Sequence, residues 1–220
     1  ASPLLRQAVS QVAALPSAAN VLVVFDYDAT QAGEMDQLAD ALLRHLLARN
    51  ANLTAVSLNP IGPGLAQTTW DAIEPELRSQ GAWRNLGYVA GQSIGVQEAL
   101  LKAGPIDLVV ELAASPDALR WWIEQRQAVG HPAPLIAGVS AAAESLALPY
   151  AQSRQVTGLI SGAAGATVYA REAAVLTPET TTIKQVQLES LTLANWLMAV
   201  IVLIALVAVL FGRTRKGGPA

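Results

Sequence analysis

Short apolar runs alternate with longer amphipathic stretches along residues 1–174 of this 220-residue chain. The apolar runs are rich in Val, Ile and Leu and carry little polar alternation, which is typical of strands buried on both faces. We expect strong strands at residues 21–25, 53–58, 106–112 and 135–139, and strands with weaker patterns at 85–89 and 156–160.

The stretches between these runs place apolar residues at helical spacing. Residues 33–49 carry Met35, Leu38 and Leu42 on one side, with charged residues on the other. We expect further helices at residues 63–79, 93–103, 116–129, 140–152 and 163–173, and an N-terminal helix at 2–14 that packs on the sheet or leads from it. This alternation predicts an α/β fold of one domain: a mostly parallel open sheet of about five or six strands with helices on both faces, Rossmann-like.

A long uncharged run, residues 191–211, follows this region without an internal Pro or Gly. At about 1.5 Å per residue such a helix is roughly 31 Å long, close to the roughly 30 Å hydrocarbon core of a bilayer. Trp196 lies near its first turn, where an indole favours the headgroup region. We expect a transmembrane helix at 191–212; the alternative is a buried helix of a soluble protein.

Basic residues flank this run mainly on its C-terminal side. Arg213, Arg215 and Lys216 follow it, whereas residues 175–190 contain only Lys184. Basic flanks stay in the cytoplasm, so we expect a cytoplasmic tail at 213–220, a stalk at 175–190 and a head at 1–174 outside the cytoplasm. The alternative is a tail-anchored chain with a cytosolic head. The sequence starts at Ala1 and not at Met, which is expected if a signal peptide was removed. A shortened chain would look the same.

The charge balance limits the partners of the head. Three of the 14 basic residues lie in the tail, so 11 basic and 17 acidic residues precede it. Nucleic acid and anionic lipid both require clustered basic residues, and the head has them only singly. The chain contains no Cys, which excludes disulfides, thiolate metal sites and a Cys nucleophile. We expect no cofactor unless the head is a metal-dependent hydrolase.

The strand at 21–25 runs directly into the sequence Asp-Tyr-Asp-Ala-Thr, residues 26–30. This segment resembles the opening motif of the haloacid dehalogenase superfamily of phosphohydrolases, an apolar strand followed by Asp-x-Asp-x-Thr. The resemblance implies that Asp26 is the nucleophile, that Asp28 is the general acid and base, and that both help to hold Mg²⁺. The alternative is that both Asp side chains belong to a turn before a helix, where they accept hydrogen bonds from backbone N–H groups.

The superfamily pattern also asks for further residues beyond this motif. Ser57 or Ser140 matches the required Ser or Thr, and Lys102 is the candidate Lys. Glu111 and Asp117 lie where a later acidic pair is expected, but they are not at its short spacing. The motif therefore predicts a phosphohydrolase only in part.

Residues 91–95 read Gly-Gln-Ser-Ile-Gly, between an apolar run and a predicted helix. This G-x-S-x-G sequence resembles the nucleophile elbow of α/β-hydrolases, which implies Ser93 as nucleophile and His131 as its base. Acidic residues that could complete a triad lie downstream: Asp107, Glu111 and Asp117. The alternative is that Ser93 caps a helix and the glycines allow a tight turn.

The remaining histidine and a tryptophan pair lie on predicted helices. We expect His45 to be a surface or boundary residue of the helix at 33–49. Trp121 and Trp122 are adjacent, and neighbouring helical positions point about 100° apart. One indole of the pair is therefore expected to be buried against the sheet, and the other to lie nearer the surface.

Two classes of function follow from these patterns. The first is a single-pass, noncatalytic binding or scaffolding subunit whose partners are the lipid bilayer and other membrane-complex subunits, or a second copy of itself. The second is a membrane-tethered hydrolase that uses Asp26 and Asp28 with Mg²⁺, or Ser93. The first is favoured, because neither motif has its full set of supporting residues and a fold alone assigns no activity.

Overall fold

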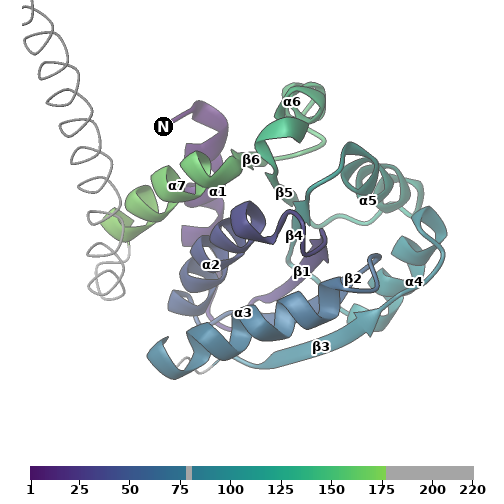
Figure 1. Cartoon of the computed structure of the whole chain (residues 1–220), viewed down its shortest axis with the longest axis horizontal. Coiled ribbons are helices and arrows are strands. Elements are labelled where there is room, and N and C mark those ends of the chain that lie inside the picture. The colour runs from purple at the N-terminus through teal and green to yellow at the C-terminus, as the bar shows by residue number, and fades with distance from the viewer. Residues whose placement is uncertain (78–80, 177–220) are drawn as a thin grey trace, which may run out of the picture. The chain divides into compact units, whose positions relative to one another are not determined.

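Six parallel strands form the centre of the molecule, and helices cover both faces of the sheet (Figure 1). The computed structural model describes residues 1–77 and 81–176. Its strands are β1 (Asn20–Asp26), β2 (Asn52–Ser57), β3 (Trp83–Tyr88), β4 (Leu108–Ala113), β5 (Leu135–Val139) and β6 (Gly158–Ser161). Its α-helices are α1 (Pro3–Ala13), α2 (Ala32–Ala48), α3 (Gly62–Leu77), α4 (Ser93–Ala103), α5 (Pro116–Ala128), α6 (Glu144–Gln152) and α7 (Gly162–Leu176).

The strand order in the sheet is β3-β2-β1-β4-β5-β6. Every pair is parallel, so all six carboxyl ends lie along one edge. The chain first builds outward from β1 to β3 and then returns to β4 on the other side of β1. The order therefore reverses between β1 and β4, which is where open sheets of this kind leave a crevice for ligands. The predicted Rossmann-like α/β fold is confirmed.

Two apolar layers separate the sheet from its helices. Val21, Val23 and Phe25 of β1 belong to the layer beneath α1, α2, α3 and α7. Leu22 and Val24 point the other way, into the layer beneath α4, α5 and α6. Because successive residues of a strand alternate between faces, a strand covered by helices on both sides must be apolar at nearly every position. This explains the continuous apolar runs of the sequence.

The weaker predicted strands and the N-terminal helix are also present. β3 and β6 lie within two residues of the bounds expected for them. In α1, Pro3 occupies the first turn and the Ser2 side chain accepts a hydrogen bond from Leu5 N at 3.1 Å. The helix packs on the sheet at β6, where a Cβ on Gly158 would lie 2.7 Å from the Cβ of Ala8. Glycine at this strand position allows the close approach.

The predicted anchor lies outside the described residues. The transmembrane helix at 191–212, with Trp196, and the tail with Arg213, Arg215 and Lys216 all fall there, as does nearly all of the stalk. Among residues 1–77 and 81–176, none of the helices combines the length and the hydropathy that a membrane span requires. The membrane anchor therefore stays a prediction from the sequence.

Candidate functional site

Asp26 ends β1 at the point where the strand order reverses. Its side chain is only 5% exposed and points into the layer beneath α5. Oδ1 accepts hydrogen bonds from Leu58 N at 2.7 Å and from Ser57 Oγ at 3.0 Å, and Oδ2 accepts one from Trp122 Nε1 at 2.9 Å. Both carboxyl oxygens are thus bound by donors from β2 and α5. Burial raises the pKa of Asp26, and these donors oppose that rise.

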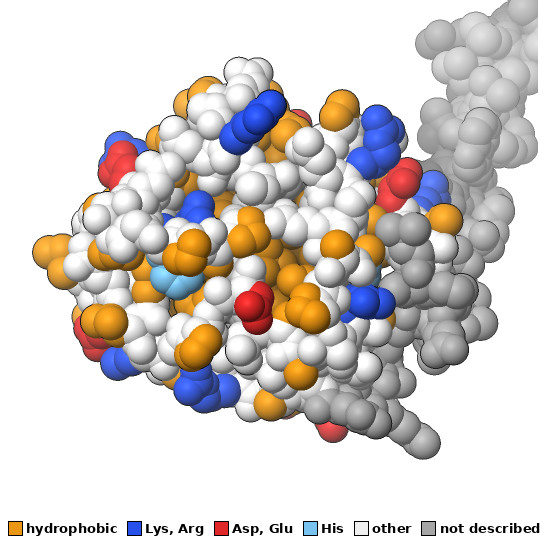
Figure 2. Space-filling model, turned by 180° about the vertical axis from the view of Figure 1, so that it is seen from behind, with side chains coloured by type: hydrophobic (Ala, Val, Ile, Leu, Met, Phe, Trp, Pro, Cys, Tyr) orange, Lys and Arg blue, Asp and Glu red, His pale blue; other side chains and the backbone are white. Residues whose placement is uncertain are grey.

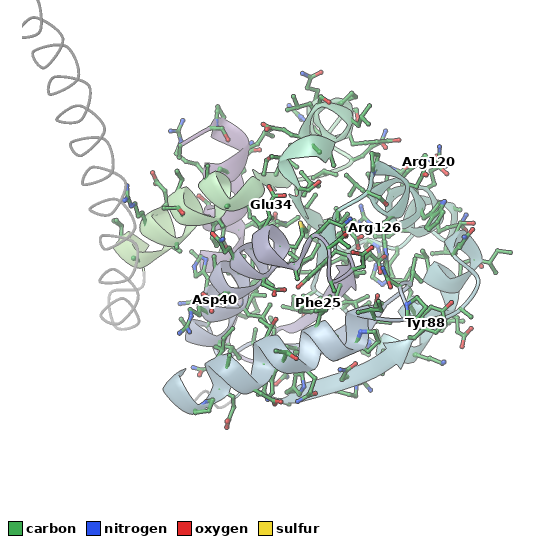
Figure 3. The ribbon with its side chains drawn as sticks, in the orientation of Figure 1. Phe25, Glu34, Asp40, Tyr88, Arg120 and Arg126 are labelled. Carbon is green, nitrogen blue, oxygen red and sulfur yellow. The ribbon has the colours of Figure 1, made fainter. Side chains whose placement is uncertain are left out.

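The segment after β2 is folded tightly against the end of β1. Ser57 Oγ lies 2.7 Å from Phe25 O as well as near Asp26, and it accepts a hydrogen bond from Asn59 N at 2.8 Å. A Cβ on Gly62 would lie 2.2 Å from both Phe25 O and Ser57 Oγ. Only glycine fits there, so the start of α3 is held directly against the strand ends. Figure 3 shows Phe25 in the interior of the fold at this point.

Glu111 supplies a second carboxyl group next to Asp26. It lies within β4, where the register pairs Glu111 with Val24 and Ala113 with Asp26, so both acids point to the same face. Its side chain is 0% exposed, and neither carboxyl oxygen accepts a hydrogen bond from any donor in the described part of the chain. Burial, and then the neighbouring Asp26 carboxylate, raise the pKa of Glu111 well above its ordinary value.

Asp28 has a different role from Asp26. Its Oδ1 accepts hydrogen bonds from Thr30 N at 2.7 Å and Thr30 Oγ1 at 2.6 Å, and these bonds lower the pKa of Asp28. Between the two acids, the buried Tyr27 hydroxyl donates to Asp36 at 2.7 Å. The segment therefore has one buried acid and one partly exposed acid in a turn. The carboxyl group that lies against Asp26 belongs to Glu111.

The other residues that the phosphohydrolase motif requires do not gather around Asp26, apart from Ser57 and Glu111. Lys102 pairs with Glu98 at 2.6 Å on α4, and Ser140 Oγ donates to Ala114 O at 3.0 Å. Asp117 lies on the surface of α5, 3.1 Å from Arg120. Within residues 1–77 and 81–176 there is no cluster of three or more His, Asp or Glu side chains suited to a metal ion.

The G-x-S-x-G segment forms a tight strand-to-helix turn, as the elbow resemblance predicts. The strained positions are Gly91 (φ 104°) and Gln92 (φ 52°), while Ser93 is the first residue of α4. A Cβ on Gly95 would lie 2.6 Å from Ala90 O, so glycine is needed for this close approach. The non-glycine residue with the unusual backbone is thus Gln92 and not Ser93.

Ser93 and His131 lie at opposite ends of the sheet. Ser93 follows β3 at the carboxyl edge, whereas His131 precedes β5 at the amino edge. At about 3.3 Å per residue, a strand of five residues separates the two edges by roughly 16 Å. The structure therefore does not bring this serine and histidine together as a triad requires.

His45 is buried, and the expectation of a surface or boundary residue is wrong. It is 3% exposed, and its Nδ1 lies 2.8 Å from the hydroxyl of Tyr169 on α7. Burial, followed by the positive charge of Arg49, lowers the pKa of His45 to about 4. The helix α7, far away in the sequence, covers this position of α2.

The helix α5 carries both an indole and a cation on its buried side. Trp122 is fully buried and Trp121 is only partly buried, as the spacing predicted. One turn further on, Arg126 donates hydrogen bonds to the carbonyl groups of Ala133 and Gln155, before β5 and β6. Figure 3 shows Arg120 at the outside of the same helix and Arg126 toward the interior. Arg126 thus ties two loops at the amino edge.

The carboxyl pair is the group that sequence reasoning missed. The sequence motifs offered Glu111 as part of an acidic pair or as a triad acid, not as a partner of Asp26. One signal for a special role was present: Glu111 is the single ionisable residue inside the otherwise apolar strand Leu108–Ala113. Chemically, two adjacent buried carboxyl groups can hold and release a proton. No known protein family matches the chain, and no curated protein is significantly similar to it. Its function must therefore be argued from these residues.

Proposed function

We propose that this chain is a single-pass, membrane-anchored α/β protein whose head, outside the cytoplasm, acts as a noncatalytic binding or scaffolding subunit of a membrane assembly. One observation carries the noncatalytic part. Both oxygens of Asp26, the strongest catalytic candidate, are bound by the donors Leu58 N, Ser57 Oγ and Trp122 Nε1 in a buried setting. A nucleophile or a metal ligand needs an oxygen that faces the substrate or the metal ion, whereas the Asp26 side chain is only 5% exposed.

The surface of the head supports a binding role without assigning a partner. Exposed apolar side chains lie near the carboxyl ends of β2 and β3 and on α4: Ile61, Tyr88, Ile94 and Leu101. Ile94 and Leu101 are seven residues apart on α4, so they point to the same side of that helix. On the face drawn in Figure 2, basic side chains are scattered singly among polar and apolar ones. This distribution does not favour nucleic acid, which needs a basic patch.

The membrane part of the proposal depends on the sequence alone. The uncharged run at 191–211 has the length of a bilayer span, and the basic cluster after it favours a cytoplasmic C-terminus. Protease added to intact cells or spheroplasts should remove the head. A head that resists until the membrane is broken would contradict the proposed orientation.

Native purification tests the binding role. The full-length chain, extracted in mild detergent, should elute in a particle larger than its monomer, with other chains or with further copies of itself. A strictly monomeric species would contradict the scaffold proposal. A matched preparation carrying Ile94→Ser and Leu101→Ser would show whether the exposed side of α4 contributes to the particle.

Activity assays test the alternative, a membrane-tethered hydrolase. The full-length chain should not hydrolyse a generic phosphomonoester in the presence of Mg²⁺, and a fluorophosphonate probe should not label Ser93. A phosphatase rate that Asp26→Asn abolishes would establish the phosphohydrolase instead. Labelling that Ser93→Ala removes would establish the serine hydrolase.

A further inference from the structure

Two buried carboxyl groups share one site between β1 and β4. Asp26 and Glu111 are diagonal neighbours on the same face of adjacent parallel strands, and they are 5% and 0% exposed. Two neighbouring carboxylates repel each other strongly when both are buried, so such a pair keeps a proton. The geometry therefore requires one of the two groups to be neutral at pH 7.

The hydrogen bonds around the pair assign the proton to Glu111. Asp26 lies within hydrogen-bond distance of three donor groups, from Leu58, Ser57 and Trp122, and such bonds stabilise the ionised form. Glu111 has no such donor within the described residues. A protonated Glu111 can itself donate, and the Asp26 carboxylate beside it is the acceptor.

The charged groups near the pair are few. From β1 the only one is Asp26, and the neighbouring residue of β5 in the register is Ala137. α4 and α6 bury only apolar residues in this layer. On α5, Arg126 is the buried charge, and its hydrogen bonds go to the carbonyl groups of Ala133 and Gln155. No cation within the described residues forms an ion pair with Glu111 or Asp26, so the proton is what keeps the pair at a single negative charge.

We propose that this shared proton is a pH-sensitive latch that holds α5 against the sheet. Trp122 of α5 donates to the same Asp26 carboxylate that accepts the proton of Glu111, so β1, β4 and α5 meet at one charge. When the proton leaves at alkaline pH, the pair carries two charges and must be hydrated. Because the fully buried Trp122 is hydrogen-bonded to Asp26, hydration of the pair should break this bond and loosen α5 from the sheet.

The pH dependence of unfolding tests the latch. Above about pH 7 the unfolded chain has released the glutamate proton that the folded chain retains, so stability falls as pH rises. For one retained proton, the unfolding equilibrium constant of the full-length chain should increase about tenfold per pH unit until the folded pair ionises. Below about pH 9, where the buried Tyr27 and Tyr169 do not yet contribute, Glu111→Gln should remove this dependence, since its amide can donate to Asp26 and cannot ionise. Glu124→Gln, on the exposed side of α5, should leave the dependence unchanged.

Carbon-13 spectra of glutamate carboxyl groups give a second readout that does not require a stable variant. In the full-length wild-type chain at pH 7, one glutamate resonance should lie at the position of a protonated carboxylic acid and move only at alkaline pH. Glu111→Gln should remove that resonance, and Glu124→Gln should retain it. Absence of any protonated glutamate at pH 7 would overturn the proposal, and so would equal pH dependence of unfolding in wild type and Glu111→Gln.

Discussion

Each face of the sheet buries a pair of titratable groups, one acidic and one formed by a histidine and a tyrosine, and the two pairs are built differently. Beneath α5, Asp26 and Glu111 form an acidic pair in which the donors all bind Asp26. Beneath α7, His45 faces the hydroxyl of Tyr169, and its second ring nitrogen, Nε2, is without a partner among the described residues. The acidic pair joins β1, β4 and α5, whereas the histidine pair joins only α2 and α7.

The same burial gives these clusters opposite responses to pH. It raises the pKa of Glu111, so the folded chain keeps a proton that the unfolded chain loses, and stability falls as pH rises. It lowers the pKa of His45 to about 4, so only the unfolded chain takes up a proton as pH falls from about 6.5 toward 4. At His45 acid therefore weakens the face beneath α7, and at Glu111 alkali weakens the face beneath α5. Burial also raises the pKa of Tyr169, so strongly alkaline pH, above about pH 10, weakens both faces.

The largest expected effect comes from removing the carboxyl group of Asp26, the member of the acidic pair that accepts the hydrogen bonds. Asp26→Ala leaves Trp122 Nε1 and Leu58 N as buried donors without their acceptor, at about 1–3 kcal/mol for each group. We expect the free energy of unfolding to drop by about 2–6 kcal/mol in chemical denaturation, the sum for the two groups. Asp28→Ala is the matched control, two residues away in a partly exposed turn, and should cost no more than about 1 kcal/mol.

A stability gain in Asp26→Ala would reverse this interpretation. Active-site groups are often kept although they destabilise the fold, so removing one commonly stabilises a protein. An Asp26→Ala variant more stable than wild type would thus favour the hydrolase alternative over a structural acid. The outcome is independent of the phosphatase assay and can be read without knowing a substrate.

The second effect concerns the histidine cluster and the acid side of the pH profile. His45→Gln cannot take up a proton at this position, so its stability relative to that of wild type should rise as pH falls below about 6.5. One proton over 1.5 pH units corresponds to about 2 kcal/mol, measured as the difference between the two unfolding curves at pH 6.5 and pH 5. His131→Gln, at a partly exposed histidine, should change the profile far less. Parallel profiles for wild type and His45→Gln would contradict the assignment.

The hydrophobic patterns along the chain predicted the strands and helices because each pattern follows from which side chains are buried. The runs at 21–25 and 135–139 are apolar at every position since helices cover both sides of β1 and β5. Asp26 was also predictable as a site residue, because it is the first polar residue after such a run. Its environment was not predictable, since Glu111 and Trp122 are distant in the sequence and reach it only through the strand order.

The spacing of residues in α2 could have predicted that His45 is buried. His45 lies seven residues after Leu38 and three after Leu42, so its side chain falls on the apolar side of α2. A buried imidazole needs a hydrogen-bond partner, and the sequence around His45 does not reveal one, so a boundary position was expected. That partner is Tyr169, 124 residues later, on a helix whose position over α2 depends on the whole fold.

The smallest expected effect comes from the tyrosine of the histidine cluster. Tyr169→Phe removes the hydroxyl that faces His45 Nδ1 and should lower the free energy of unfolding at pH 7 by about 1 kcal/mol, the usual scale for one neutral hydrogen bond. Tyr88→Phe, at a tyrosine that is 46% exposed, should leave stability unchanged. His45 and Tyr169 are both neutral at pH 7, and one neutral hydrogen bond is lost, whereas Asp26→Ala leaves two buried donors without an acceptor. A loss as large as that of Asp26→Ala would mean that the histidine pair carries a charge at pH 7, and the opposite pH responses of the two faces would no longer follow.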